Sequence, residues 1–223
     1  MKTLKIIPVI LLFVVFGSVP LFSQEKQHEK IQKSTEVLKE FAAMKESIPA
    51  QLMEKAEGII VIPNLIKAGL GIGGQRGKGV AMVKRSNGSW SDPAFITLTG
   101  GSIGFQAGVE SIDLVMVITK GGILRDLGKG EFTLGGDISV AAGPFGRSTS
   151  ATTDDDFDAE VYSYSRSKGL FAGLTLNGSR ISSDEDANKD FYGSHHTATA
   201  VFDKKPSDNP GVLSLKAAVK AFN

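Results

Sequence analysis

The chain has 223 residues, with 25 lysines and arginines against 24 aspartates and glutamates. A balance this close to neutral excludes the strongly basic surface typical of nucleic-acid-binding domains, so no nucleic-acid partner is expected. The sequence contains no cysteine, which excludes disulfides and cysteine-ligated metal sites.

The first residues are typical of a secretory signal peptide. Lys2 and Lys5 precede an apolar run over residues 6–16, and small residues follow up to Ser23. The alternative, an uncleaved membrane anchor, is disfavoured because the run is interrupted by Pro8 and is shorter than the ~20 residues of a spanning helix. We therefore expect residues 1–23 to be removed and the protein to be exported, in the periplasm or associated with the cell envelope. Residues 24–223 then suit a single domain with its own core, placed at about residues 31–193.

Two helices are predicted at the start of this domain. Residues 25–45 have helical spacing, and Pro49 suits the first turn of a second helix that ends at Gly58. The apolar positions of the first helix are Ile31, Leu38, Phe41, Ala42 and Met44. We expect this amphipathic face to pack on the domain. The alternative is that it lies on a membrane surface and supplies apolar contact there.

From Gly58 onward the pattern changes to short β-prone runs separated by glycine clusters. The runs are 59–62, 80–83, 95–98, 112–119, 138–141, 161–164 and 170–176. Later helices are predicted over 121–127, over 184–191 with Ser183 as N-cap, and over 211–222. The predicted fold class is α+β, a curved antiparallel β-sheet or barrel-like sandwich with N-terminal and C-terminal helices packed on it.

Several motifs match a catalytic or ligand-binding pattern without its required context. Residues 69–74 match G-x-G-x-x-G, but no helix-forming sequence follows. Residues 100–104 match the G-x-S-x-G nucleophile elbow around Ser102, with His195 and His196 downstream, but a strand-like sequence follows instead of a helix. Residues 184–190 carry Asp or Asn at alternate positions like the first half of a calcium loop, yet the segment lacks the glycine and the final glutamate of such a loop. No catalytic residue, metal site or cofactor is expected.

A set of cations in the glycine-rich first third of the chain is the candidate binding site. Glycine loops expose backbone N–H groups, and nearby lysines and arginines add charge, a combination that suits an anionic lipid head group. The candidates are Lys67, Arg76, Lys78, Lys84 and Arg85. The alternative is that these are scattered solvated charges. A second, weaker group comprises Arg147, Arg166 and Lys168.

Five glycine-punctuated phrases, in this order, carry a resemblance to a known family. They are GIIVIPNLIKAGLGIGGQRGKG (58–79), AFITLTGGSIGFQAG (94–108), FTLGGDISVAAGPFGRS (132–148), YSYSRSKGLFAG (162–173) and DEDANKDFYG (184–193). The chain resembles the SYLF lipid-binding domain, which is also described as an actin-binding domain in its fungal members. The resemblance implies binding of phosphoinositides and other acidic lipids, and no enzymatic activity. Actin is an unlikely partner for an exported chain.

The leading hypothesis is a non-enzymatic, exported lipid-binding protein that recognises anionic phospholipid or phosphoinositide-like head groups at a membrane surface. The first alternative is an envelope protein-interaction or scaffold domain without lipid function. The third hypothesis is a serine hydrolase that uses Ser102.

Overall fold

The computed structural model describes residues 19–44, 48–120, 122–127, 130–143, 158–168, 170–171, 174–193 and 197–222. For residues 19–23, 71, 102–107 and 171 it describes the backbone alone. The helices are α1 (Val19–Ala43), α2 (Ala50–Lys55), α3 (Gly122–Asp126), α4 (Glu185–Tyr192), α5 (Ala198–Asp203) and α6 (Pro210–Lys220). The strands are β1 (Gly58–Val83), β2 (Ala94–Ile118), β3 (Glu131–Thr133), β4 (Val140–Ala142), β5 (Val161–Ser167), β6 (Leu170–Phe171) and β7 (Arg180–Ser183).

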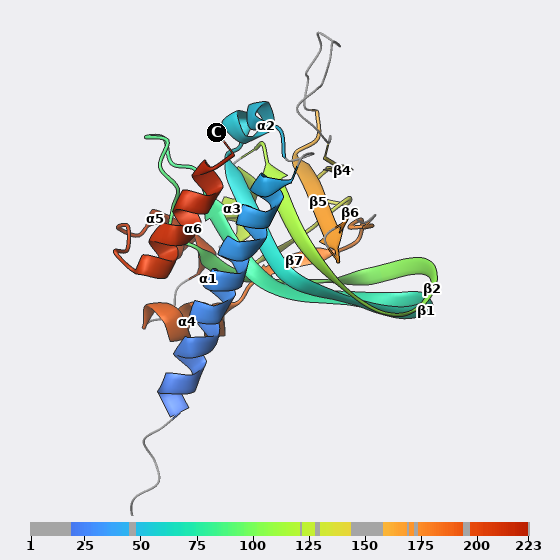
Figure 1. Ribbon diagram of the computed structural model, residues 1–223. Coiled ribbons are helices and arrows are strands. Elements are labelled where there is room, and N and C mark those ends of the chain that lie inside the picture. Colours follow the sequence, from blue (N-terminus) through green and yellow to red (C-terminus); the bar gives the residue numbers. More distant parts are fainter. Residues whose placement is uncertain are drawn as a thin grey trace, which may run out of the picture.

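The fold is organised by a two-stranded antiparallel ribbon made of β1 and β2, which are 26 and 25 residues long. Pairing runs from Gly58 opposite Ile118 to Ala81 opposite Ala94. The ribbon also folds back on itself between Gly69 and Gly73, so that a Cβ added at Gly69 would lie 2.6 Å from the Cα of Gly73. Figure 1 shows both strands running away from the helices, turning, and returning.

Two parts of this ribbon differ in packing and in exposure to solvent. We call residues 66–73 of β1 and 102–109 of β2 the apex, and residues 58–65 and 77–83 of β1 with 94–98 and 112–118 of β2 the base. At the base the two halves of β1 are in contact. A Cβ at Gly79 would overlap the carbonyl oxygen of Val61, and one at Gly77 would lie 2.5 Å from Cγ2 of Ile62. Glycine is required at these positions because the neighbouring backbone approaches so closely.

The two halves of β2 pair with different strands, which makes the sheet curl. Residues 113–118 pair with β5, whereas residues 96–99 pair with β7. β3 extends the sheet beyond β7, and β4 and β6 pair with β5, giving a seven-stranded sheet. Its pairs are antiparallel except β4 with β5, which is parallel. The predicted α+β class with a curved sheet is confirmed, with this one parallel pair in addition.

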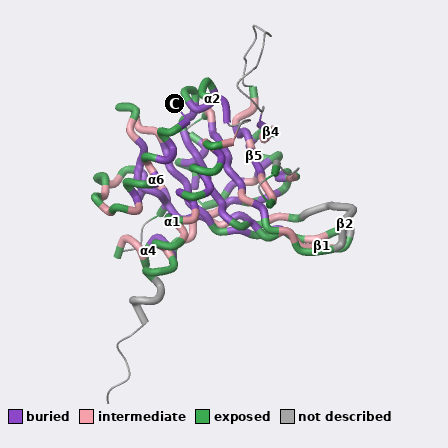
Figure 2. The backbone as a smooth tube through the Cα atoms, in the orientation of Figure 1, coloured by how far each residue is buried: buried purple, intermediate pink, exposed green. Residues whose placement is uncertain are grey.

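The base of the ribbon separates two hydrophobic cores. Since successive side chains of a strand point to opposite faces, Ile59 and Val61 join one core while Ile60 and Ile62 join the other. The first core contains side chains of α1, α2, α4 and α6, and the second contains side chains of α3 and α5. Figure 2 shows the buried residues concentrated at this end of the ribbon.

The apolar face of α1 is buried in the first core. Ile31, Leu38 and Phe41 have no exposed surface, and Ala42 and Met44 pack partly buried against the same cluster. The predicted packing of the N-terminal helix on the sheet is therefore confirmed. The alternative in which these side chains contact a membrane is wrong for this structure, because the core already covers them.

Most helices start or end where their capping residues predict. The carboxylate of Asp184, one residue after the predicted cap, accepts a hydrogen bond from the Ala187 amide at the start of α4. Asn209 caps α6 by accepting bonds from the amides of Gly211 and Val212. Helix α5, capped by Thr197, was not predicted from the sequence.

A buried ion pair fastens α6 to the loop between β1 and β2. Asp92 has no exposed surface, and Nζ of Lys216 donates to its Oδ1 at 2.6 Å. The amide of Ser207 donates to Oδ2 of the same carboxylate at 2.9 Å. This arrangement holds the C-terminal helix against the base of the ribbon.

Candidate functional site

The apex exposes apolar side chains that the rest of the fold leaves uncovered. Leu70, Ile72 and Val109 are 80%, 82% and 76% exposed, and Ile66 is 43% exposed. These four are the majority of the large apolar side chains exposed in the described part of the chain, the others being Leu170 and Leu213. Exposed apolar side chains that gather at one place mark an interaction surface far more often than single scattered ones do.

The local sequence explains why the apex projects. The alternation of glycine with Leu70 and Ile72 keeps β-pairing possible, with Gly69 opposite Gly108 and Leu70 opposite Ala107. The register shifts between Leu70 and Gly71, and the close approach of Gly69 to Gly73 shows that the strand reverses there. Figures 1 and 2 show this end of the ribbon standing clear of the helices.

Of the five predicted cations, Lys67 lies within the apex and Arg76 lies between the apex and the base. Lys67 lies opposite Glu110 in the ribbon, and Arg76 lies opposite Thr99. Lys67 is partly exposed and Arg76 is exposed. Neither forms an ion pair with another residue in the part of the chain that the structure describes.

The other three predicted cations have structural partners. Nζ of Lys78 lies 2.6 Å from Oδ2 of Asp184. Nζ of Lys84 donates to the carbonyl of Glu54 at 3.1 Å. The guanidinium of Arg85 donates to the carbonyls of Phe202 and Lys204 at 3.0 and 2.6 Å, at the end of α5. The structure thus separates Lys67 and Arg76, which have no ion-pair partner among the described residues, from three cations that connect elements of the fold. It does not bring the five into one cluster.

The second, weaker group of cations is not assembled into a site either. Arg166 donates to Asp113 at 2.9 Å and to Glu40, and its guanidinium lies 5.5 Å from the ring centroid of Phe41. It therefore joins α1 to the sheet. Arg147 lies outside the described residues, as do His195 and His196.

The catalytic and ligand-binding motifs adopt other structures. Residues 69–74 lie within β1, without the strand–turn–helix of a dinucleotide site. Ser102 lies within β2, paired with Gly73 and followed by more strand, whereas a nucleophile elbow opens a helix. Residues 185–192 form the capped helix α4 instead of a calcium loop. No group of three or more His, Cys, Asp or Glu able to hold a metal ion occurs among the described residues.

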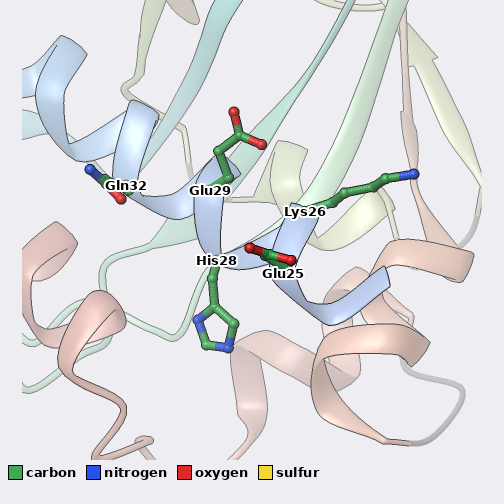
Figure 3. A pocket seen from close by; sticks show the side chains of 5 residues that line it. All are labelled: Glu25, Lys26, His28, Glu29 and Gln32. Carbon is green, nitrogen blue, oxygen red and sulfur yellow. The ribbon is translucent and has the colours of Figure 1, made fainter. Parts of the chain in front are cut away.

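One surface depression lies along the start of α1, and Figure 3 shows its side chains. It is lined by Glu25, Lys26, His28, Glu29 and Gln32, which all come from this one helix and are all exposed. Figure 3 also shows them splayed outward instead of converging on a common point. A hydrogen bond from Lys33 lowers the pKa of Glu29. Solvated side chains on a single helix do not enclose a ligand.

Near this depression, burial lowers the pKa of Lys30 and the adjacent cations Lys33 and Lys78 lower it further. The negative charges of Glu29 and Asp184 act in the opposite direction. The charges here are mixed in sign, so this junction between α1 and the ribbon does not form an anion site.

The described helices include none with the length and apolarity needed to span a bilayer.

The described residues form a curled sheet covered by helices, with one uncovered ribbon end, and the motif matches among them do not adopt the geometry that those motifs require. Residues 99–222 match the family model described as "Ysc84: Las17-binding protein actin regulator". The chain belongs to this Ysc84 family, whose domain is the SYLF domain, and the resemblance seen in the sequence is confirmed.

Similar proteins come from fungi and animals. The chain is 34% identical to LAS seventeen-binding protein 3 of Saccharomyces cerevisiae over 91% of its own length and 45% of that protein. It is 36% identical to the SH3 domain-containing YSC84-like protein 1 of Xenopus laevis over 73% of the chain and 50% of that protein. With the human protein of the same name it shares 33% identity over 78% and 52% of the two lengths. The chain therefore spans about half the length of the curated relatives it matches.

Proposed function

We propose that this Ysc84-family domain is a non-enzymatic, exported protein that binds anionic lipid head groups at a membrane surface. The observations that carry the proposal are Lys67 within the apex and Arg76 on the returning arm of β1, opposite Thr99, where β2 also pairs with β7. Neither is ion-paired with a described residue, whereas Lys78, Lys84 and Arg85 are held by partners. The resemblance of the sequence to the SYLF lipid-binding domain implies the same class of ligand.

The expected electrostatic affinity is moderate. Each lysine or arginine close to an anionic leaflet contributes about 1 kcal/mol, and the attraction is screened within a Debye length. Glu110 lies opposite Lys67 and offsets part of its attraction. Binding by these two cations should therefore be reversible and should weaken as salt is added.

Co-sedimentation of the purified protein with phosphatidylcholine vesicles containing increasing phosphatidylserine tests this proposal. We expect the bound fraction to rise with anionic lipid and to fall with salt. The double charge reversal Lys67→Glu with Arg76→Glu should weaken binding about tenfold or more. The matched control reverses Lys205 and Lys220, which are exposed and distant from the apex in sequence. Equal loss in both double variants would show a net-charge effect and would remove the site from Lys67 and Arg76.

A protein partner is the second candidate function, and the family description favours it. The family model is named for a Las17-binding actin regulator, and similar yeast proteins carry a corresponding name. We propose co-sedimentation of the purified protein with actin filaments as its test. Binding to filaments but not to any vesicle would replace the lipid proposal with this one.

The hydrolase hypothesis has little geometric support, because residues 100–104 belong to an uninterrupted strand. A serine-directed fluorophosphonate probe is its direct test. Stoichiometric labelling that is lost in Ser102→Ala would contradict the non-enzymatic proposal.

A further inference from the structure

The boundary between covered and uncovered apolar side chains on the ribbon is sharp. Leu65 and Ile112 are completely buried, whereas Ile66, the next residue along β1, is 43% exposed. Beyond it, Leu70 and Ile72 are among the most exposed apolar side chains of the described chain. The exposure therefore begins where the ribbon leaves the base.

Charge at the apex indicates which kind of surface covers these side chains. Lys67 and Arg76 lie on the two arms of the folded β1, a few residues on either side of Leu70 and Ile72. Lysine and arginine have long apolar stems and can keep their charged ends at lipid head groups while neighbouring apolar side chains lie deeper. Cations beside an apolar tip complement an anionic bilayer.

The backbone of the apex is compatible with partial entry into a bilayer. Pairing between β1 and β2 continues through it, with Ala68 opposite Val109 and Ile72 opposite Ile103. Paired strands satisfy the backbone groups between them, which unpaired loops would leave exposed to an apolar medium. The register shift between Leu70 and Gly71 and the two outer edges of this two-stranded ribbon leave other backbone groups without a strand partner, so only shallow entry into the interfacial region is expected.

A second copy of the chain is a weaker occupant. Stable protein–protein interfaces bury about 1,200–2,000 Å² in total. Four apolar side chains at a narrow ribbon end supply only a small part of such an area. Insertion into a bilayer requires no such minimum area, because each side chain is transferred separately into the apolar phase.

We propose that the apex inserts Leu70, Ile72 and Val109 into the interfacial region of an anionic bilayer while Lys67 and Arg76 remain at the head groups. This inference rests on the proposed membrane-binding function and adds an apolar, salt-resistant component to it. The ligand is then the bilayer surface as a whole, with loosely packed, unsaturated anionic lipid favoured over tightly packed saturated lipid.

The test uses the full chain with vesicles of dioleoyl phosphatidylcholine and dioleoyl phosphatidylserine. Leu70→Ser with Ile72→Ser should lower the partition coefficient about tenfold or more, because two large apolar side chains no longer leave water. The matched control is Leu213→Ser, which changes a half-exposed leucine on α6 and should leave partition unchanged.

A second measurement reports insertion directly. The chain has no cysteine, so Ile72→Cys and Leu213→Cys each provide a unique site for an environment-sensitive NBD label. On addition of vesicles, we expect a blue shift and quenching by brominated lipid for the label at position 72, and neither change at position 213.

The outcomes separate the two proposals. If the wild-type protein binds no vesicle, the proposed function itself fails. If it binds while Leu70→Ser with Ile72→Ser binds equally well and the label at 72 stays unshifted, insertion is overturned and head-group binding stands. If the label at 72 shifts without vesicles as protein concentration rises, a second copy covers the apex and the inference is overturned.

Discussion

The base and the apex of the β1–β2 ribbon are built from the same two strands, yet they have opposite environments. At the base, Ile60, Ile62 and Leu65 are buried between packed elements. At the apex, Leu70 and Ile72 face solvent. Glycines also act differently, since Gly79 at the base lies against the Val61 carbonyl whereas Gly101, near the apex, has open space around it.

Apolar residues in a strand therefore do not by themselves identify a part of the hydrophobic core. Helices and neighbouring strands cover the base from both sides, so its side chains carry the stability of the domain. No described element covers the apex, so its apolar side chains are available for a ligand. Stability measurements should therefore respond to the base, and binding measurements should respond to the apex.

The largest expected contrast comes from two isoleucines on the same strand. Ile62→Ala should lower the free energy of unfolding by about 4 kcal/mol, because it removes a fully buried side chain and leaves a cavity. Ile72→Ala should change it by less than about 0.5 kcal/mol, because that side chain is already in water. Urea denaturation of both variants measures the difference. Similar losses in both would mean that the apex is covered in solution.

The next largest contrast in stability should come from replacing lysines of the two regions. Lys216→Ala leaves the buried Asp92 carboxylate without its cation and should cost about 3 kcal/mol. Lys67→Ala at the apex and Lys220→Ala, an exposed lysine on α6, should each cost less than about 0.5 kcal/mol. Thermal unfolding checks all three variants. An unchanged midpoint in Lys216→Ala would show that the ion pair does not fasten α6 to the base.

Replacing glycine by alanine should lower the free energy of unfolding in the base but not near the apex, by a smaller amount than the changes above. Gly79→Ala should destabilise the protein by about 2 kcal/mol, because the new methyl group overlaps a backbone carbonyl that cannot move independently. Gly101→Ala meets no atom within 4 Å and should be close to neutral. Chemical denaturation of this pair tests the close contact between the halves of β1. Equal stability of the two variants would argue against that contact.

The last prediction concerns the alkaline pH dependence contributed by two tyrosines packed near the base. Burial raises the pKa of Tyr164 and Tyr192 above the ordinary value of about 10. Above that pH the unfolded chain releases these protons while the folded chain retains them, so stability should fall by up to about 1.4 kcal/mol per pH unit for each tyrosine. Below it, neither group contributes a pH dependence. Denaturation at pH 9, 10 and 11 should show this loss, and Tyr164→Phe with Tyr192→Phe should reduce it. An identical slope in the double variant would exclude these tyrosines as its source.

The sequence predicted local elements well and the candidate site in part. Capping residues and helical spacing placed most helices within a few residues, whereas the short helix α5 has too little periodicity to stand out. The β-prone runs at 59–62 and 80–83 were expected to be separate strands, but they are the two ends of β1. Glycine-rich segments between them resemble loops in a sequence, because glycine permits both a turn and a bent strand.

The five predicted cations show why the sequence identified the candidate site only in part. These cations were selected by charge and by nearby glycines, which cannot show whether a side chain already has a partner. Lys78 meets Asp184 and Arg85 meets the end of α5, over separations of about a hundred residues in the chain. The apolar apex was missed because Leu70 and Ile72 lie in a glycine-rich segment between two predicted strands, which was considered only as a loop and as a possible nucleotide-binding motif. Their flanking glycines were the available signal.

The α+β class, the family resemblance and the positions of most helices follow from the amino-acid sequence, because they depend on local periodicity, capping and characteristic phrases. Which apolar side chains are covered, and which cations have partners, is known only from the three-dimensional fold. Both properties depend on contacts between residues far apart in the chain, such as those of Lys78 with Asp184 and of Arg85 with the end of α5. The reversal of the ribbon at Gly69–Gly73 brings the two halves of β1 together at the base and leaves Leu70 and Ile72 at the apex in water.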